Sequence, residues 1–567
     1  KDDGPSLLST TTNAEHRTQT KRMSSLETDS PSPSPTRQEC VNTRYDDQEE
    51  EDPAEPAQAV ICGAGIVGLV LALALHEHVG IKAEVYEAAP KFAEDVGAAM
   101  GMYPNGLRVL RDIDPSLCDA VRAAGCPYLF RRWERHDGTE VAVATENVLS
   151  KCNDSSISPS SLGLGLPVMD DTIVSSGDSS SRGSDDEEGD EFCSMGIMRW
   201  RFQRILQDAA MSRDIPIHFN KRTVSVDFIN GDGGLESVSS DDIDQIVTVR
   251  FEDGTSRRTR LLFGADGSKS TVRRSVADPK SRLEYSGVTC LMGIASNVSR
   301  PPRGIYFPSS TTTKCHAVFF PTREDGEQCF QFHFPVPAEK ADEGNWGTLS
   351  EKVGREECRE LANKLREDGW DEKYLQPLAE VKRAVRIGFC TLVPNLEHWV
   401  YGETNGNHDG ENANNKRPDG NNRRRGHVVL LGDAAHPPLP YIGQGAQIGL
   451  EDAGVLALLL KNLCLDASGV FRMQNFSRAA KVYEKMRIPR AYAMLDNSAF
   501  MGRMQQKRAD NERHNEVKEE LIRRQVFFHE NLPVYFPGVQ YDYREDVERV
   551  LATEASVVLP MLTEEQG

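Results

Sequence analysis

The sequence has few features of metal-binding, membrane-spanning or nucleic-acid-binding proteins. Its twelve cysteines include no CxxC pair and no cysteine-histidine spacing typical of zinc sites, so we expect reduced thiols and no metal. No run of about 18 or more apolar residues is free of charges or turn residues, and no transmembrane span is therefore expected. The basic cluster at Arg423 to Arg425 is too small for a nucleic-acid footprint, so nucleic acid is not an expected partner.

Hydrophobic residues are also scarce, at 38% of the chain, which suggests that parts of it join no core. The formal net charge of -21 is concentrated in two tracts. Residues 46–55 contribute -7 and residues 178–191 contribute -6, which leaves -8 for the rest. Acidic, low-complexity tracts of this kind indicate solvated disorder rather than a binding surface.

A length of 567 residues predicts two or three domains, and shifts in composition divide the chain further. We expect a disordered segment at 1–57 and a strand-helix domain at 58–281, interrupted by a disordered acidic insert at 151–194. A sheet-rich domain at 282–400, a polar loop at 401–426, the rest of the first domain at 427–495 and a charged helical region at 496–567 follow. Thiol usage favours a cytoplasmic protein, although the Ser/Thr/Pro-rich start leaves a plastid or another organelle open. The sequence does not indicate an oligomeric state.

Several elements can be expected from local patterns. The stretch "IMRWRFQRILQDAAMSRD" at 197–214 has helical periodicity, and a strand is expected near Ile217. A strand pair near 246–251 turns at "EDGT", and β-prone runs between 283 and 335 predict a mostly antiparallel sheet. Cys62 and Cys290 lie in apolar runs and are expected in the core. The charged run "QQKRADNERHNEVKEELIRRQ" at 505–525 predicts a helix.

The stretch "AVICGAGIVGLVLALAL" places Gly63, Gly65 and Gly68 in GxGxxG spacing between an apolar strand and a long apolar helix. In such a turn the first glycine allows a tight bend, the second lets a pyrophosphate approach, and the third lets helix and strand pack closely. Glu87 ends the next strand, in "AEVYEAAP", where an acid can bind the ribose of an adenosine. These features predict a dinucleotide site for FAD or NAD rather than NADP.

A second glycine-rich stretch, "VVLLGDAAHPPLPYIGQGAQIGLEDAGVLALLL", lies at 428–460. Its apolar strand ends at Gly432 and Asp433, and a helix is expected to open between Gly443 and Gly445. A carboxylate at the strand end could bind the ribityl hydroxyls of a flavin, which a nicotinamide dinucleotide lacks. The free amides of the helix start could hold the electron-rich edge of the flavin ring. The second stretch therefore favours FAD.

With these motifs the chain resembles the single-component, class A FAD-dependent monooxygenases of the salicylate and para-hydroxybenzoate hydroxylase type. The pattern in "LLFGADGSKSTVRR", with Asp266, Gly267, Ser270 and Arg273, resembles the part of that family near the FAD pyrophosphate and the nicotinamide nucleotide. Arg199 in "MRWRFQRIL" matches an arginine that reaches the FAD phosphates, and "AAMGMYPNGLRVL" and "YEKMRIPRA" are weaker matches. The resemblance covers most of 58–495 and implies an α/β fold: a Rossmann-type FAD-binding domain, an inserted antiparallel substrate domain and a helical C-terminus.

The resemblance implies an NAD(P)H-consuming monooxygenase that hydroxylates or epoxidises a small aromatic or other electron-rich substrate, using dioxygen and a flavin C4a-hydroperoxide. The flavin carries the chemistry, NADH or NADPH docks transiently, and no protein nucleophile is expected. Pro440 is the residue expected beside the flavin ring. The expected cofactor-binding residues are Gly63, Gly65, Ile66, Val67, Gly68, Glu87, Arg199, Asp266, Gly267, Gly432, Asp433, Gly443, Gln444, Gly445 and Ala446.

Three side chains of the 283–335 sheet, Tyr285, His316 and His333, are candidates for contact with substrate, although packing is the more common role of each. His436 is expected to be structural rather than catalytic. An alternative function is a flavoprotein scaffold with little catalysis, which recruits partners through the inserts and the C-terminal helix. The intact glycines and acids of the FAD motifs argue against that alternative.

Overall fold

The computed structural model describes residues 55–92, 98–145, 193–228, 246–277, 280–296, 303–310, 314–341, 346–402, 427–506, 539 and 541–564. All of them belong to the compact unit Asp52–Gly567. The predicted disordered segment before residue 55, nearly all of the 151–194 insert and the 403–426 part of the polar loop lie outside these residues. So do nearly all of the predicted helix at 505–525 and the link from it to residue 539.

Eight of the described strands form the first sheet, in the order β18-β19-β11-β1-β2-β8, with β10 joined to β11 and β9 to β10. They are β1 (Ala57–Cys62), β2 (Glu84–Tyr86), β8 (Ile217–His218), β9 (Thr223–Phe228), β10 (Val247–Phe251), β11 (Ser256–Gly264), β18 (Val400–Tyr401) and β19 (His427–Leu430). The strands β8, β2, β1, β11 and β19 run parallel. Such strands are apolar along their length because helices cover both faces of a parallel sheet.

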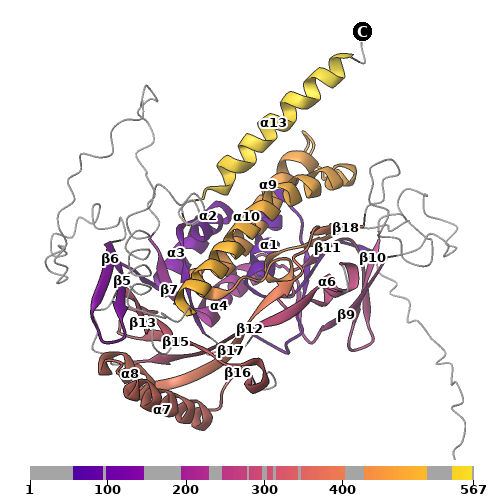
Figure 1. Cartoon of the computed structure of the whole chain (residues 1–567). Coiled ribbons are helices and arrows are strands. Elements are labelled where there is room, and N and C mark those ends of the chain that lie inside the picture. Colours follow the sequence, from indigo (N-terminus) through magenta and orange to yellow (C-terminus); the bar gives the residue numbers. More distant parts are fainter. Residues whose placement is uncertain are drawn as a thin grey trace, which may run out of the picture. The chain divides into compact units, whose positions relative to one another are not determined.

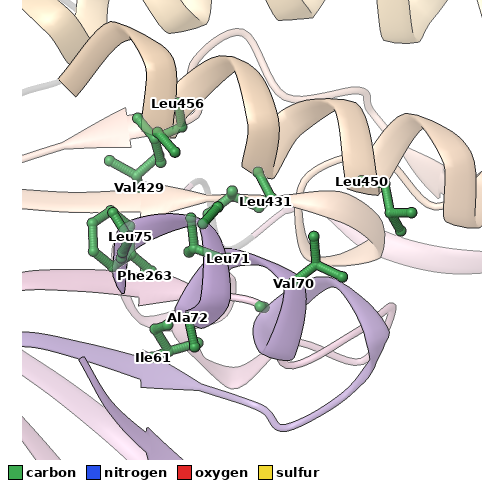
Figure 2. Close-up of a cluster of buried hydrophobic side chains, with 14 of the residues drawn as sticks. Ile61, Val70, Leu71, Ala72, Leu75, Phe263, Val429, Leu431, Leu450 and Leu456 are labelled. Carbon is green, nitrogen blue, oxygen red and sulfur yellow. The ribbon is translucent and has the colours of Figure 1, made fainter. Parts of the chain in front are cut away.

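Helix α1 (Ile66–Ala74), which continues as a π-helical turn at Leu75–Val79, packs between this sheet and helix α9 (Gly445–Cys464). Figure 2 shows Leu71 of α1 and Leu75 of the π-helical turn among Phe263, Val429 and Leu431, all of them fully buried. Burying each such side chain contributes about 1.5–3 kcal/mol. The core therefore lies directly behind the turn that joins β1 to α1.

The remaining helices of the first domain and the C-terminal part lie around this core, and the last of them packs against it through its N-terminal part (Figure 1). They are α2 (Pro104–Ile113), α3 (Pro115–Ala124), α4 (Arg199–Met211), α6 (Thr271–Val276), α10 (Phe476–Gln506) and α13 (Tyr543–Glu564). Short 3-10 helices occur at η4 (Ala338–Lys340), η7 (Gly432–Ala434), η8 (Pro440–Ile442) and η9 (Met473–Asn475). Helix α10 packs along α9, and none of the described helices is apolar over a length that could traverse a bilayer.

The second sheet has the strand order β16-β17-β12-β15-β14-β13-β5-β6. Its strands are β5 (Phe130–Arg135), β6 (Glu140–Thr145), β12 (Arg282–Ala295), β13 (Gly304–Ser309), β14 (His316–Pro321), β15 (Gln328–Pro335), β16 (Gly347–Thr348) and β17 (Val381–Val393). All neighbours are antiparallel except β13 and β5. Helices α7 (Glu351–Glu367) and α8 (Glu372–Ala379) pack on one face (Figure 1). This arrangement confirms the predicted α/β class with a second, mostly antiparallel sheet.

Three details differ from the expected organisation. Strands β5 and β6, expected in the first domain, pair with β13 and so cover an edge that would otherwise expose unpaired amides. The helix expected over 197–214 begins at Arg199, because Ile197 and Met198 pair as strand β7 (Met195–Met198) with β3 (Ala99–Met102). Strand β4 (Cys126–Pro127) completes that small sheet. Helix α10 crosses the expected boundary at 495 without interruption.

Other local predictions are confirmed. The "EDGT" turn joins β10 to β11 in antiparallel register, and a short strand, β8, begins at Ile217. Cys62 and Cys290 are both buried in the core.

Candidate functional site

Four neighbouring parallel strands end in register at one edge of the first sheet. Cys62, the last residue of β1, is paired with Tyr86 of β2 and with Gly264 of β11, and Gly264 is paired with Leu430 of β19. The segments that follow these strands carry Gly63, Glu87, Asp266 and Asp433. Ligands of open α/β sheets bind beyond the carboxyl ends of the strands. The sheet therefore gathers four of the predicted residue groups at the place where such a fold binds its ligand.

Two of the three motif glycines are required by packing within the protein. Gly63 has a φ of +102°, and a Cβ there would lie 2.5 Å from the carbonyl oxygen of Ala265. A Cβ on Gly68 would lie 1.9 Å from the carbonyl oxygen of Gly63. These contacts bring the β1–α1 turn against the segment after β11 and hold α1 close to its strand, as the motif predicts.

Gly65 differs from its two neighbours in the motif. It precedes the first residue of α1; within the described part of the chain, no side chain caps this helix start and a Cβ on Gly65 would meet no atom within 4 Å. The first amides of α1, at Ile66 and Val67, are therefore not capped by a side chain, and free helix-start amides attract anions. The protein leaves open the side of this turn that the motif assigns to a pyrophosphate.

Glu87 is bound to the glycine turn itself. Its carboxylate accepts hydrogen bonds from the backbone N–H groups of Ala64 (2.9 Å) and Ala89 (2.8 Å), one on each oxygen. Each oxygen keeps a lone pair for another donor, such as a ribose hydroxyl. Gln203 of α4 donates to the Ala64 carbonyl at 3.0 Å and fixes the turn from the other side. Sequence reasoning missed Gln203, which lies four residues after the arginine that it did select.

Asp266 combines a satisfied oxygen with an unsatisfied one. Its Oδ2 accepts from the N–H groups of Thr271 (2.7 Å) and Val272 (3.1 Å), whereas its Oδ1 is buried and has no hydrogen-bond partner among the described residues. Burial raises the pKa of Asp266, and hydrogen bonds, the first of them from Ser270, partly offset the rise. Gly267 follows with a φ of +79° and open space around its α-carbon. A buried acceptor without a partner is costly, which points to a donor supplied by a ligand.

Arg273 holds two loops together. Its guanidinium donates to the carbonyl oxygens of Ala434 (2.7 Å) and Ser268, and its side chain is buried. Ser270 caps the short helix α6 by accepting the Arg273 N–H at 2.9 Å. Arg273 therefore joins the loop of Asp266 to η7, the 3-10 turn that contains Asp433. The hydrogen bonds of its guanidinium go to backbone carbonyls of the protein, a bridging role that the sequence pattern alone does not reveal.

The turn at Gly432 packs directly on α1. Gly432 has a φ of +56°, and a Cβ there would lie 3.0 Å from Cγ2 of Val67. Asp433 is solvent-exposed, yet desolvation by the surrounding chain raises the pKa of its carboxyl. The charges of Arg199 and Arg273 act in the opposite direction. Arg199, the exposed first residue of α4, is therefore within electrostatic range of Asp433.

An ionic cluster supports this turn from behind, and we call it the Asp452 cluster; it consists of buried His436, Glu451, Asp452 and Arg487 and partly exposed Arg490. Asp452 of α9 accepts from the Gly432 N–H (2.9 Å), from His436 Nε2 (2.6 Å) and from Arg487 Nε (2.8 Å). Arg487 also pairs with Glu451 at 2.9 Å, and Arg490 pairs with Glu451 at 2.8 Å.

Burial alone would raise the pKa of Asp452, but the charges and hydrogen bonds of His436 and Arg487 lower it. His436 is thus part of the support of the turn, as its expected structural role implied. Sequence reasoning did not assign roles to Asp452 or Arg487, although "YEKMRIPRA" was a weak family match.

The expected flavin-ring segment lies at the start of α9. Pro440, exposed, opens η8, and Gly443 has a φ of +66° with the Tyr103 hydroxyl 2.9 Å from the position of a Cβ. Gln444 is buried: its Oε1 accepts from Asn105 at 2.9 Å, while its Nε2 has no hydrogen-bond partner among the described residues. Gly445 and Ala446, half-buried, form the first turn of α9. Tyr103 and Asn105 come from "MYPNG", a stretch noticed in the sequence without a role for either residue.

The three candidates for substrate contact fall into different environments. Tyr285 shares a hydrogen bond with Thr289 Oγ1 (2.8 Å) and donates to the Val336 carbonyl (3.1 Å), so protein groups occupy its hydroxyl. His316 and His333 lie side by side, with ring centroids 5.5 Å apart, and both are buried. His333 also contacts the ring of Tyr441 of η8, at 5.8 Å between centroids. His333 thus lies beside Tyr441, the neighbour of Pro440, and its ring nitrogens have no hydrogen-bond partner among the described residues. The Tyr285 hydroxyl, in contrast, is already hydrogen-bonded to protein groups.

Comparisons with known proteins agree with this geometry. A family model described as "FAD binding domain" matches residues 56–373. A FAD-dependent monooxygenase of Gibberella moniliformis is 26% identical over 474 residues, which cover 78% of this chain and 86% of that protein. The 3-amino-4-hydroxybenzoate 2-monooxygenase of Streptomyces cremeus is 26% identical over 439 residues, or 76% of this chain and 83% of that protein.

Among solved structures, Klebsiella pneumoniae HpxO complexed with FAD and uric acid has a TM-score of 0.58 at 21% identity, over 85% of this chain and 97% of that one. This likeness is evidence for the fold.

Proposed function

Because the chain belongs to the class A family of FAD-dependent monooxygenases, we propose that it hydroxylates or epoxidises a small aromatic or otherwise electron-rich substrate, with NADH or NADPH as electron donor. One atom of dioxygen goes to the substrate and the other leaves as water. The observation that carries this proposal is the meeting of four strand ends around an open glycine turn and a buried carboxylate oxygen, Asp266 Oδ1, that has no hydrogen-bond partner in the described chain.

The proposed cofactor contacts follow the two halves of FAD. The amides of Ile66 and Val67 beside Gly65 bind the pyrophosphate with Arg199, and Glu87 binds the adenosine ribose. Asp433 binds the ribityl hydroxyls, and Asp266 Oδ1 accepts a hydrogen bond from the central part of the cofactor. The full set that we propose is Gly63, Gly65, Ile66, Val67, Gly68, Glu87, Arg199, Asp266, Gly267, Gly432, Asp433, Gly443, Gln444, Gly445 and Ala446.

Bound FAD would supply the oxygen-transfer chemistry, through reduction by NAD(P)H and a C4a-hydroperoxide as the family resemblance implies. The start of α9 and the second sheet would hold the ring between them. Pro440 and the amides of 443–445 would flank the ring and keep water away from it. The face of β12, β15 and β17 that carries Cys290, His333 and Phe389 would hold the substrate on the other side. Support for this placement comes from Tyr441, which lies next to Pro440 and packs on Phe389 of that sheet at 5.5 Å between centroids.

The test uses the purified full-length chain. We expect it to retain FAD, and we expect at least one hydroxyarene of a panel to accelerate NADH or NADPH oxidation and to gain one atom from isotopically labelled dioxygen. The ratio of the two oxidation rates identifies the electron donor. Failure to bind added FAD would refute the cofactor assignment. Bound FAD without any oxygenated product across the panel would refute the monooxygenase assignment.

A further inference from the structure

The last turns of helix α10 pack on η8, the short helix that begins at Pro440. Two contacts join the two elements. The hydroxyl of Ser498, a fully buried residue of α10, donates a hydrogen bond to the carbonyl oxygen of Leu439. Gly502 of α10 lies against the ring of Tyr441, so that a Cβ on Gly502 would be 2.3 Å from Cε2 of that ring. Both chain neighbours of Pro440 are therefore held by α10.

The contact between Gly502 and Tyr441 leaves no room for a larger residue. Gly502 lies inside α10, which ends at Gln506, although glycine is less favourable than alanine within a helix. The Tyr441 ring cannot simply swing away from α10, because it also contacts the rings of Phe389 and His333 on the second sheet. The distances between ring centroids are 5.5 Å and 5.8 Å, and both pairs meet edge to face. Tyr441 thus spans the space between α10 and the second sheet.

We propose that Gly502 and Ser498 are positioning residues that fix the place of residues 439–443, which we call the Pro440 segment. This proposal rests on the proposed function, in which the Pro440 segment flanks the flavin ring and keeps water away from it. The two residues act through Tyr441 and Leu439 and not by contact with a ligand.

The physical basis is close packing. A Cβ added at Gly502 would push the Tyr441 ring toward the second sheet, where other rings already meet it. Because packed interiors transmit such a displacement and do not absorb it, the backbone of the Pro440 segment has to move. Loss of the Ser498 hydroxyl would release the Leu439 carbonyl and loosen the same segment from its other end.

The experiment measures how easily solvent ions reach the flavin in the FAD-loaded, full-length protein. Iodide quenches flavin fluorescence on contact, so its quenching constant at fixed ionic strength reports how exposed the ring is. We expect Gly502→Ala to raise this constant about twofold or more, because a displaced segment no longer keeps solvent from the ring. Ser498→Ala, which removes one hydrogen bond and adds no atom, should raise the constant by a smaller factor.

A second contact between a helical glycine and a tyrosine ring supplies the matched control. A Cβ on Gly454 of α9 would lie 2.8 Å from Cε2 of Tyr543, at the start of α13. Gly454→Ala therefore introduces the same kind of clash away from the Pro440 segment. It should lower the melting temperature, as Gly502→Ala does, but leave the iodide quenching constant at the wild-type value.

A double-mutant cycle tests whether the effect passes through the tyrosine ring. Tyr441→Leu removes the ring that the new Cβ would meet, and by itself it should raise the quenching constant. Adding Gly502→Ala to Tyr441→Leu should then change the constant little, since residues that act through one contact are not additive. Full additivity of the two substitutions would contradict the proposed route.

Equal quenching constants in wild type and Gly502→Ala, or equal rises in Gly502→Ala and Gly454→Ala, would overturn the inference. If Gly502→Ala does not fold, Ser498→Ala decides, and a quenching constant equal to that of the wild type overturns the inference. All of these outcomes leave FAD binding by the wild type intact and so do not affect the proposed function. A wild type that binds no FAD would overturn the proposed function and this inference together.

Discussion

Two buried polar regions of this protein are built in opposite ways. In the Asp452 cluster every charge has a partner of opposite sign within the chain, and the cluster ends on the backbone of Gly432. The ring of His333 contacts the rings of His316, Phe389 and Tyr441, and both of its nitrogens are left without a described partner. The charges of the Asp452 cluster pair with one another and stabilise the fold, whereas His333 has no ion-pair or hydrogen-bond partner among the described residues. The same distinction separates the two oxygens of Asp266, one bonded to backbone and one free of described partners.

The largest expected effect comes from removing a charge from the Asp452 cluster. Arg487→Met leaves the buried carboxylates of Glu451 and Asp452 short of a cation, which should lower the free energy of unfolding by about 3–5 kcal/mol. Urea unfolding followed by fluorescence measures this. Arg472→Met, which removes an exposed ion pair with Asp466, should cost no more than about 1 kcal/mol. Equal losses in the two variants would show that the cluster is not a special support.

The glycine turn offers the same contrast between packed and open positions. Gly68→Ala forces a Cβ against the Gly63 carbonyl, which should lower the free energy of unfolding by about 1–3 kcal/mol. The same substitution should also weaken FAD binding. Gly65→Ala meets no protein atom, so the apoprotein should be as stable as the wild type or slightly more stable. Its FAD content should nevertheless fall sharply, because the added methyl group occupies the open side of the turn. Normal flavin content in Gly65→Ala would contradict the pyrophosphate assignment.

A smaller effect is expected at the exposed end of the supported turn. Asp433→Ala should weaken FAD binding about ten- to a hundredfold, the loss expected for hydrogen bonds to a charged acceptor. Asp433→Asn keeps one acceptor oxygen, so its dissociation constant for FAD should lie between those of the wild type and Asp433→Ala. Isothermal titration of apoprotein with FAD gives the three dissociation constants. An unchanged constant in Asp433→Ala would remove this residue from the proposed site.

The smallest effect concerns a satisfied pair at the surface. The Nδ1 of His398 lies 2.9 Å from Glu484, and this hydrogen bond raises the pKa of the histidine. A raised folded-state pKa stabilises the protein fully below the unfolded value of about 6.5, and the gain disappears as the pH rises through the folded value. Because the His398 side chain is 64% exposed, His398→Gln should cost less than about 1 kcal/mol at pH 5.5 and nothing at pH 9. Melting temperatures of the wild type and the variant at both pH values test this pH dependence. A greater loss of stability at pH 9 than at pH 5.5 would contradict it.

The sequence predicted those parts of the site that are encoded by short spacing. Gly63, Gly68 and Gly432 could be selected because a turn between a strand and a helix needs small residues at fixed positions. Arg487 and Asp452 lie 35 residues apart on two helices, so their pairing depends on how α9 and α10 pack.

Other side chains could be named from the sequence but not assigned a role. The sequence marks His333 as a polar candidate. That its ring nitrogens have no described hydrogen-bond partner depends, however, on the register of three strands. Arg273 was recognised too, but its contacts with backbone carbonyls required the fold. Spacing is thus enough to predict the glycine motifs, whereas the surroundings of the side chains on the second sheet depend on how its strands pair.

The β5–β6 hairpin has a consequence for engineering. Residues 130–145 complete the edge of a sheet whose other strands lie between 282 and 393, and the ring of Phe130 fills the space that Gly304 leaves by lacking a Cβ. A chimera that takes only residues 282–393 from a relative would place the relative's β13 against Phe130 of this chain. The new β13 would then have to leave the same space for the Phe130 ring. Recombination between relatives therefore needs two crossover blocks, exchanged together, to transfer the whole second sheet without loss of folding.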